Sequence, residues 1–215
     1  MNISSNVINV DLRSAMKKII SIVLLLCTIL CFGGCKEIVQ PEKKVVKYIQ
    51  NLKNYTCDVE YTFKNEKDQD KYSAKHYYMK DEGYRLDLGE DRVNIYKGDY
   101  IYVEDKKAGK KYEVIKEFDE IYKYTFLNEI VDLTSHPESK VYAEDDEESD
   151  KHYVVIEFII PSTNRNIAKG VLYMNSLTLK PEVEKIYDLK GEERVEIRFN
   201  DFVANEAMEK EAFQE

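Results

Sequence analysis

The segment YTCDVEYTF, residues 55–63, alternates strictly between apolar and polar side chains. Its odd-numbered positions carry Tyr, Cys, Val, Tyr and Phe, and its even-numbered positions carry Thr, Asp, Glu and Thr. Successive side chains of an extended strand point to opposite faces, so the pattern predicts a β-strand with one face in the core. Cys57 falls in the apolar set, which favours a small core residue over a reactive thiol.

Ten further segments after residues 55–63 carry strand signals. They are Lys71–Met79, Tyr84–Leu88, Val93–Tyr96, Tyr100–Val103, Lys111–Ile115, Lys140–Ala143, His152–Ile160, Ile167–Met174, Val183–Asp188 and Arg194–Phe199. Lys97-Gly98-Asp99 lies between two of them and is a strong hairpin signal. His152–Ile160 is apolar on both faces, which predicts a central strand covered on both sides.

Three other segments favour helices. Residues 36–53 repeat apolar side chains at helical spacing, with Pro41 in the first turn. Residues 118–135 predict one amphipathic helix, and residues 205–213 predict a short one at the C-terminus. The chain shows no composition break and no internal repeat. We therefore expect one mainly β (α+β) domain, a single curved antiparallel sheet of ten or eleven strands with helices on its concave face.

Composition limits the classes of function. The chain has 215 residues, of which 34% are charged and 43% apolar, as in a globular protein. Its formal net charge is −9 and its pI about 5.1, which argues against nucleic acid as a partner because nothing offsets phosphate repulsion. The 17 Tyr residues suit half-buried strands, with the ring on apolar surface and the hydroxyl in water.

The N-terminus resembles an export signal. Lys17 and Lys18 precede an apolar run that ends at Gly33 and Gly34. The 16 residues from Ile19 to Gly34 fall short of the roughly 20 that span a bilayer, which favours a signal peptide over a transmembrane anchor. Translation from Met16 would give a compact signal of 19 residues.

Cys35 follows directly, and Phe32-Gly33-Gly34-Cys35 resembles a bacterial lipobox, in which the Cys thiol receives a lipid. An ordinary secretory signal with a chance cysteine is the alternative. We expect residues 1–34 to be the signal peptide, residues 35–40 a lipidated tether with Cys35 as the lipid attachment site, and residues 41–215 the folded domain. An acidic domain beside an anionic bilayer needs such an anchor.

Motifs for catalysis or metal binding are missing. His76, His136 and His152 share no metal-ligand spacing, and the two that lie in strands are expected to be surface or cross-strand residues. No nucleophile elbow or phosphate loop is present. Residues 144–150, EDDEESD, favour a solvated hairpin loop over a calcium loop or a docking patch for a basic partner. We expect no catalytic residues, no metal and no cofactor.

Three stretches carry a resemblance to a known superfamily. They are the opening helix into residues 52–59, the hairpin at residues 96–102, and the ending at residues 195–202 followed by Asn205 and Phe213. Together with the lipobox, they resemble the LolA/LolB/LppX superfamily of bacterial lipoprotein carriers. The resemblance implies an unclosed β half-barrel with helices plugging its mouth.

Within that superfamily the chain is most similar to the clostridial spore-germination lipoproteins of the GerS type. The resemblance implies a non-enzymatic lipoprotein on the extracytoplasmic face of the forespore membrane. It implies a role in spore germination and, as partner, a cortex N-acetylmuramoyl-L-alanine amidase of the CwlD type. A lipid or lipoprotein carrier is the alternative, and it needs an apolar cavity. The partner-binding surface is unknown from the sequence, and a homodimer formed by strand exchange stays open.

Overall fold

The computed structural model describes residues 40–214, which form one antiparallel sheet with two α-helices and three short 3-10 turns. The strands are β1 (Asn54–Lys64), β2 (Gln69–Met79), β3 (Gly83–Leu88), β4 (Arg92–Lys97), β5 (Tyr100–Asp105), β6 (Lys110–Ile115), β7 (Lys140–Asp146), β8 (Lys151–Ile159), β9 (Lys169–Asn175), β10 (Pro181–Tyr187) and β11 (Glu193–Ala204). The helices are α2 (Pro41–Gln50) and α3 (Leu127–Leu133), and the 3-10 turns are η1 (Lys116–Phe118), η2 (Tyr122–Thr125) and η3 (Lys210–Phe213).

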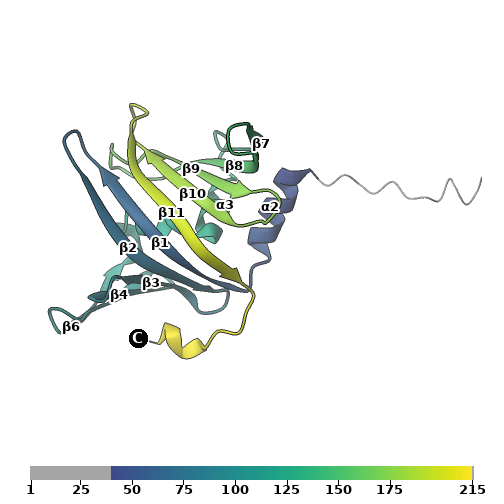
Figure 1. Ribbon diagram of the computed structural model, residues 1–215. Coiled ribbons are helices and arrows are strands. Elements are labelled where there is room, and N and C mark those ends of the chain that lie inside the picture. Colours follow the sequence, from purple (N-terminus) through teal and green to yellow (C-terminus); the bar gives the residue numbers. More distant parts are fainter. Residues whose placement is uncertain (1–39, 215) are drawn as a thin grey trace, which may run out of the picture. The chain divides into compact units, whose positions relative to one another are not determined.

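The sheet is two meanders joined at their first and last strands. The strand order is β6-β5-β4-β3-β2-β1-β11-β10-β9-β8-β7, so β1 and β11 pair in the middle although they come from opposite ends of the chain. The ends of the sheet, β6 and β7, are not paired with each other in this order, and the sheet is therefore unclosed. Figure 1 shows the long strands β1, β2 and β11 crossing the centre of the sheet. The predicted unclosed half-barrel of ten or eleven strands is confirmed, and the sheet has eleven.

The apolar face of β1 lies in the core as its alternation predicts. Tyr55, Cys57, Val59 and Tyr61 are all buried, while Asp58 between them is exposed. Helices α2 and α3 pack on each other and on β8 from the same side as these residues (Figure 1). Among the described residues, no helix combines the length and the apolarity needed to cross a membrane.

The predicted central helix over residues 118–135 is wrong in its first half. The carboxylate of Asp119 accepts hydrogen bonds from the backbone N–H groups of residues 121, 122 and 123 at 2.8 to 3.0 Å, which closes a 3-10 turn. Phe126 then has extended backbone, with φ −84° and ψ 128°, and α3 begins only after it. The predicted C-terminal helix is likewise reduced to the short turn η3.

Strand β8 was predicted to be central, and it instead lies second from the edge of the sheet. Its outward-facing Val155 is nevertheless fully buried. The cross-strand neighbours of Val155 are Tyr142 and Tyr173, so large side chains of adjacent strands flank it. Apolar residues on both faces of a strand therefore did not require a covering layer on both sides.

Candidate functional site

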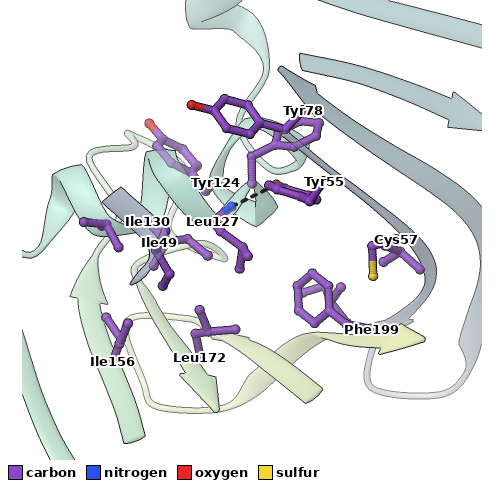
Figure 2. Packing of buried hydrophobic residues seen from close by; sticks show 14 of the residues in the cluster. Ile49, Tyr55, Cys57, Tyr78, Tyr124, Leu127, Ile130, Ile156, Leu172 and Phe199 are labelled. Atoms are coloured by element: carbon purple, nitrogen blue, oxygen red, sulfur yellow. Dashed lines mark hydrogen bonds between the residues drawn. The ribbon is translucent and has the colours of Figure 1, made fainter. Parts of the chain in front are cut away.

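The concave side of the sheet is the natural place for a site in this fold, and side chains of the chain itself fill its centre. Ile49 of α2 and Leu127 and Ile130 of α3 are fully buried against the sheet. Figure 2 shows them facing Ile156 and Leu172 from the sheet. The Leu127 N–H donates to the Tyr55 hydroxyl at 3.2 Å, which ties the start of α3 to β1. The centre is a packed core of helix and sheet.

A hydrogen-bonded group of three side chains lies within this core. The Tyr61 hydroxyl lies 2.7 Å from His76 Nε2 and 2.9 Å from Thr125 Oγ1, and all three residues are buried. His76 was expected to be a surface or cross-strand residue; it is not at the surface, and it is a cross-strand residue that pairs with β1. Burial lowers the pKa of His76 to about 3, so its imidazole is neutral at physiological pH.

Removal of the Tyr61 hydroxyl should destabilise the domain. We expect Tyr61→Phe to lower the free energy of unfolding by about 1–3 kcal/mol, because His76 Nε2 and Thr125 Oγ1 lose a partner inside the core. Urea denaturation followed by circular dichroism measures the change. Tyr100→Phe at an exposed position is the matched control and should have no effect. Equal stabilities of the two variants would contradict the prediction.

A buried carboxyl group was missed by the sequence analysis. Glu184 of β10 is fully buried, neither carboxyl oxygen has a hydrogen-bond partner, and burial raises its pKa well above the ordinary value. It lies opposite Leu172 and Ile197, whose side chains are in the core. Glu184 shares its parity with the buried Ile186 of β10, so the alternation of residues 184–186 is the signal that could have assigned it to the core face.

Cys57 is a buried core residue, as predicted. Its thiol donates to the Asn200 carbonyl oxygen at 3.1 Å, and burial raises its pKa to about 12. A thiol with so high a pKa is a poor nucleophile, because the thiolate is the reactive form. Cys35, the predicted lipid attachment site, lies outside the described residues.

The acidic run forms the end of strand β7 and the turn into β8. The turn residues 147–150 are exposed, as predicted for a solvated hairpin loop. Asp146 accepts from the backbone N–H and hydroxyl of Ser149, and Asp145 pairs with His152 at 2.7 Å. The pairing with Asp145 raises the pKa of the exposed His152. In the described part of the chain, no three His, Cys, Asp or Glu side chains are grouped so that they could hold a metal ion.

Exposed apolar side chains gather at the β6 end of the sheet. Tyr100, Ile115 and Phe118, here called the edge patch, are 44%, 46% and 77% exposed. Tyr100 and Ile115 are directly opposite each other on β5 and β6, and Phe118 follows in η1. Strand β6 is also the last strand of the sheet, so one side of its backbone has no neighbouring strand among the described residues. An apolar patch at an unpaired sheet edge is typical of a protein-binding surface.

The model of the family described as sporulation protein YdcC-like matches residues 16–213. The chain belongs to this family. The match covers all the elements of this YdcC-like chain described above. A comparison with curated proteins finds no match.

Solved structures similar to this YdcC-like chain share its fold. An uncharacterized conserved protein from Thermus thermophilus has a TM-score of 0.53 at 8% identity, covering 82% of this chain and 94% of that one. One chain of the structure of the CwlD amidase from Clostridioides difficile in complex with the GerS lipoprotein has 26% identity and a TM-score of 0.45, covering 80% of this chain and 96% of that one. The LolA superfamily protein NE2245 from Nitrosomonas europaea has 10% identity and a TM-score of 0.43, covering 81% and 97%.

Proposed function

We propose that this YdcC-like chain is a non-enzymatic lipoprotein of the forespore membrane that binds and activates a cortex N-acetylmuramoyl-L-alanine amidase of the CwlD type. Membership of a sporulation family supports the cellular process. The GerS lipoprotein is solved in complex with the CwlD amidase, and we bring that kind of partner to this chain as part of the proposal. The resemblance to GerS-type proteins in size, in the lipobox at residues 32–35 and in the ending at residues 195–202 points the same way.

The packed core on the concave side favours a protein-binding function over a lipid carrier. A carrier of acyl chains needs an apolar cavity at the centre of the half-barrel. Here Val45 and Ile49 of α2 and Leu127 of α3 occupy that centre and are fully buried. An acyl chain would have to displace both helices, whereas a protein partner can bind the outside of the sheet without such a change.

The edge patch is the surface that we propose for the amidase. Tyr100 and Ile115 offer apolar area beside the backbone groups of β6 that no neighbouring strand of the described chain pairs. Main-chain pairing to a sheet edge gives affinity, and aromatic side chains beside it add buried area at low entropy cost. A partner that pairs with β6 would then cover both the apolar side chains and the backbone edge of this strand.

The proposal predicts a direct complex that raises amidase activity. The full chain in detergent micelles and the purified amidase should form a complex at micromolar concentration, measured by light scattering. Muropeptide products from spore peptidoglycan should increase when the lipoprotein is added. Ile115→Asp should weaken binding by at least about tenfold, because a carboxylate then has to be buried in the interface.

Leu189→Asp is the matched control, since Leu189 is also a large exposed apolar residue but lies in the β10–β11 turn. It should leave binding and activation unchanged. Loss of binding in both variants, or in neither, would contradict the edge patch as the interface. No complex, with amidase activity indifferent to the lipoprotein, would overturn the function and favour the lipid-carrier alternative.

Membrane attachment through Cys35 is the second part of the proposal. We expect Cys35→Ala to move the protein from the detergent phase to the aqueous phase in Triton X-114 partitioning, because the acyl chains supply its membrane affinity. The wild-type protein should show by mass spectrometry an N-terminus at Cys35 with attached lipid. Cys57→Ala is the control, since that thiol is buried in the core. Unchanged partitioning of Cys35→Ala, with residues 1–34 still attached, would contradict the prediction.

A further inference from the structure

A pocket on the concave side lies apart from the packed centre, under the connection between β6 and α3. It has a volume of about 290 Å³ and is bounded by strands β4, β5 and β6 and by the segment that contains η1 and η2. Its lining side chains are Arg92, Asn94, Tyr96, Ile101, Val103, Tyr112, Val114, Phe118, Asp119 and Tyr122. We call this pocket the mouth pocket. Its volume is close to the lower end of the range for ligand sites, about 300 Å³.

Two polar groups in the mouth pocket have unmet hydrogen bonds. Asn94 is only 8% exposed, and its Oδ1 atom is buried without a donor. Arg92 holds the Tyr112 hydroxyl through Nη2, while its Nε–H is buried without an acceptor. A buried polar atom without a partner costs about 1–3 kcal/mol, so both atoms favour a ligand that supplies the missing partners.

The neighbouring polar groups are already satisfied. Asp119 accepts from the Tyr96 hydroxyl at 2.8 Å and from the backbone N–H groups of residues 121–123. The backbone groups of β4 and β5 pair with each other and with their neighbours in the sheet. The buried side-chain atoms of the pocket that lack a hydrogen-bond partner are therefore one acceptor, Asn94 Oδ1, and one donor, Arg92 Nε–H.

One donor and one acceptor from neighbouring side chains on the same face of a strand match a single secondary amide. Arg92 and Asn94 are two residues apart on the same face of β4, about 7 Å between Cα atoms. A trans amide with a hydrogen bond at each end spans about 8 Å, since each bond is about 2.9 Å. The amide N–H would donate to Asn94 Oδ1, and its carbonyl oxygen would accept from Arg92 Nε–H.

The other walls of the pocket indicate what carries this amide. Ile101 and Val103 of β5 are the cross-strand neighbours of Tyr96 and Asn94, and they offer apolar contact for a methyl group. Tyr112 and Tyr122 also line the pocket, and C–H bonds of a sugar ring pack well against aromatic rings, because an aromatic face carries negative charge. A peptide would bring an amide at every residue, about 3.4 Å apart, and the pocket has partners for only one.

We propose that the mouth pocket binds an N-acetylated sugar residue of a glycan, with its acetamido group between Arg92 and Asn94. This site uses other residues than the amidase interface on the outer face of β5 and β6, apart from Phe118 at the rim. The two proposals can therefore fail independently. If both hold, the lipoprotein contacts the glycan strand as well as the enzyme.

Three soluble probes separate the possible ligands. Chitotriose has acetamido groups on sugar rings, cellotriose has the rings without them, and N-acetyl-alanine methylamide has amides without a sugar. We expect the full chain in detergent micelles to bind chitotriose at or below millimolar concentration, measured by saturation-transfer NMR and titration calorimetry. Cellotriose and the blocked alanine should bind at least about tenfold more weakly, since each lacks one half of the recognised group.

Two variants test the assigned atoms. Asn94→Leu removes the acceptor and leaves an apolar side chain that the buried site tolerates, and Arg92→Lys keeps the charge but removes the Nε–H. Each should weaken chitotriose binding by about tenfold. Arg198→Lys on the outer face of β11 is the control and should have no effect.

Each contrary result overturns the proposal. Equal binding of cellotriose and chitotriose would show that the acetamido group is not recognised. Preferred binding of the blocked alanine would assign the mouth pocket to a peptide. Chitotriose binding that survives both variants, or no binding at about 10 mM, would remove the site altogether.

Discussion

Gly83→Ala should lower the free energy of unfolding by at least about 3 kcal/mol, the largest loss that we expect from adding one methyl group to this chain. Gly83 begins strand β3 with φ +105°, a conformation that residues with a Cβ atom rarely adopt. A Cβ atom there would also lie 2.2 Å from the Tyr96 carbonyl oxygen of β4. Because that oxygen belongs to the backbone of a paired strand, it cannot move aside without disturbing the ladder.

Gly98→Ala separates the clash from the cost of backbone conformation. Gly98 lies in the β4–β5 turn with φ +57°, and a Cβ atom there meets nothing within 4 Å. Gly98→Ala should therefore lower the free energy of unfolding by only about 1–2 kcal/mol, which is the cost of a left-handed backbone conformation for a residue with a Cβ atom. In thermal unfolding, Gly83→Ala should lower Tm by roughly 6–12 °C, since 1 kcal/mol corresponds to about 2–4 °C in a domain of this size. Equal losses in the two variants would show that the contact with Tyr96 is relaxed without cost.

The sheet was predictable from the sequence because its local signals agree with each other. The alternation of residues 55–63, the Gly98 turn and the short spacing of the strands all favour consecutive antiparallel pairs. The same reasoning does not reveal the pairing of β1 with β11, which joins the two ends of the domain. The resemblance to the LolA superfamily implied the unclosed half-barrel, but the pairing of its first and last strands became known only from the structure.

The helix over residues 118–135 failed because the chain turns to extended backbone at Phe126. Apolar residues recur at helical spacing there, yet tertiary contacts hold both neighbours of Phe126: Thr125 Oγ1 lies 2.9 Å from the Tyr61 hydroxyl, and the Leu127 N–H donates to the Tyr55 hydroxyl at 3.2 Å. Both partners belong to β1, a distant part of the chain. A hydrogen bond of this kind leaves no periodic trace in the sequence.

The buried polar residues were predictable only in part. His76 shares its parity with Ala74 and Tyr78, so the burial of its face could have been read from residues 74–78. Glu184 likewise shares its parity with the buried Ile186, so its face could have been read from residues 184–186, whereas its lack of a partner could not. The acceptor atom of Asn94 and the donor of Arg92 required the structure, since their significance lies in the partners that they lack.

Glu184→Leu should stabilise the domain, which is the opposite of the usual result for a substitution in a core. In the wild type, the buried carboxyl group has no partner, and an unpaired buried polar group costs about 1–3 kcal/mol. Leucine has a similar volume and fits the apolar neighbours Leu172 and Ile197. We expect the free energy of unfolding to rise by about 1–3 kcal/mol at pH 7, measured by urea denaturation.

The pH dependence of stability gives a sharper test, because Glu184 and His76 act in opposite directions. The folded state raises the pKa of Glu184 above its ordinary value of 4.5, so the folded protein retains a proton that the unfolded chain loses, and stability falls as pH rises above 4.5. The folded state lowers the pKa of His76 from 6.5 to about 3, so stability falls as pH decreases below 6.5. Between pH 4.5 and 6.5 the two contributions offset each other.

Above pH 6.5, His76 is neutral in both the folded and the unfolded state, so of His76 and Glu184 only Glu184 still makes stability depend on pH. Its contribution to the free energy of unfolding should fall by up to about 1.4 kcal/mol per pH unit. Both Glu184→Leu and Glu184→Gln should remove the Glu184 part of this fall, since neither side chain titrates, while the part due to His152, whose pKa Asp145 raises, stays in all variants. Glu184→Gln keeps a polar group in the core and should gain less stability than the leucine variant. Glu90→Gln, at an exposed turn between β3 and β4, is the control and should retain the wild-type profile. A decline between pH 6.5 and 8 that is as steep in Glu184→Gln as in the wild type would show that this carboxyl group finds a partner in solution, and Glu184→Leu would then destabilise the core.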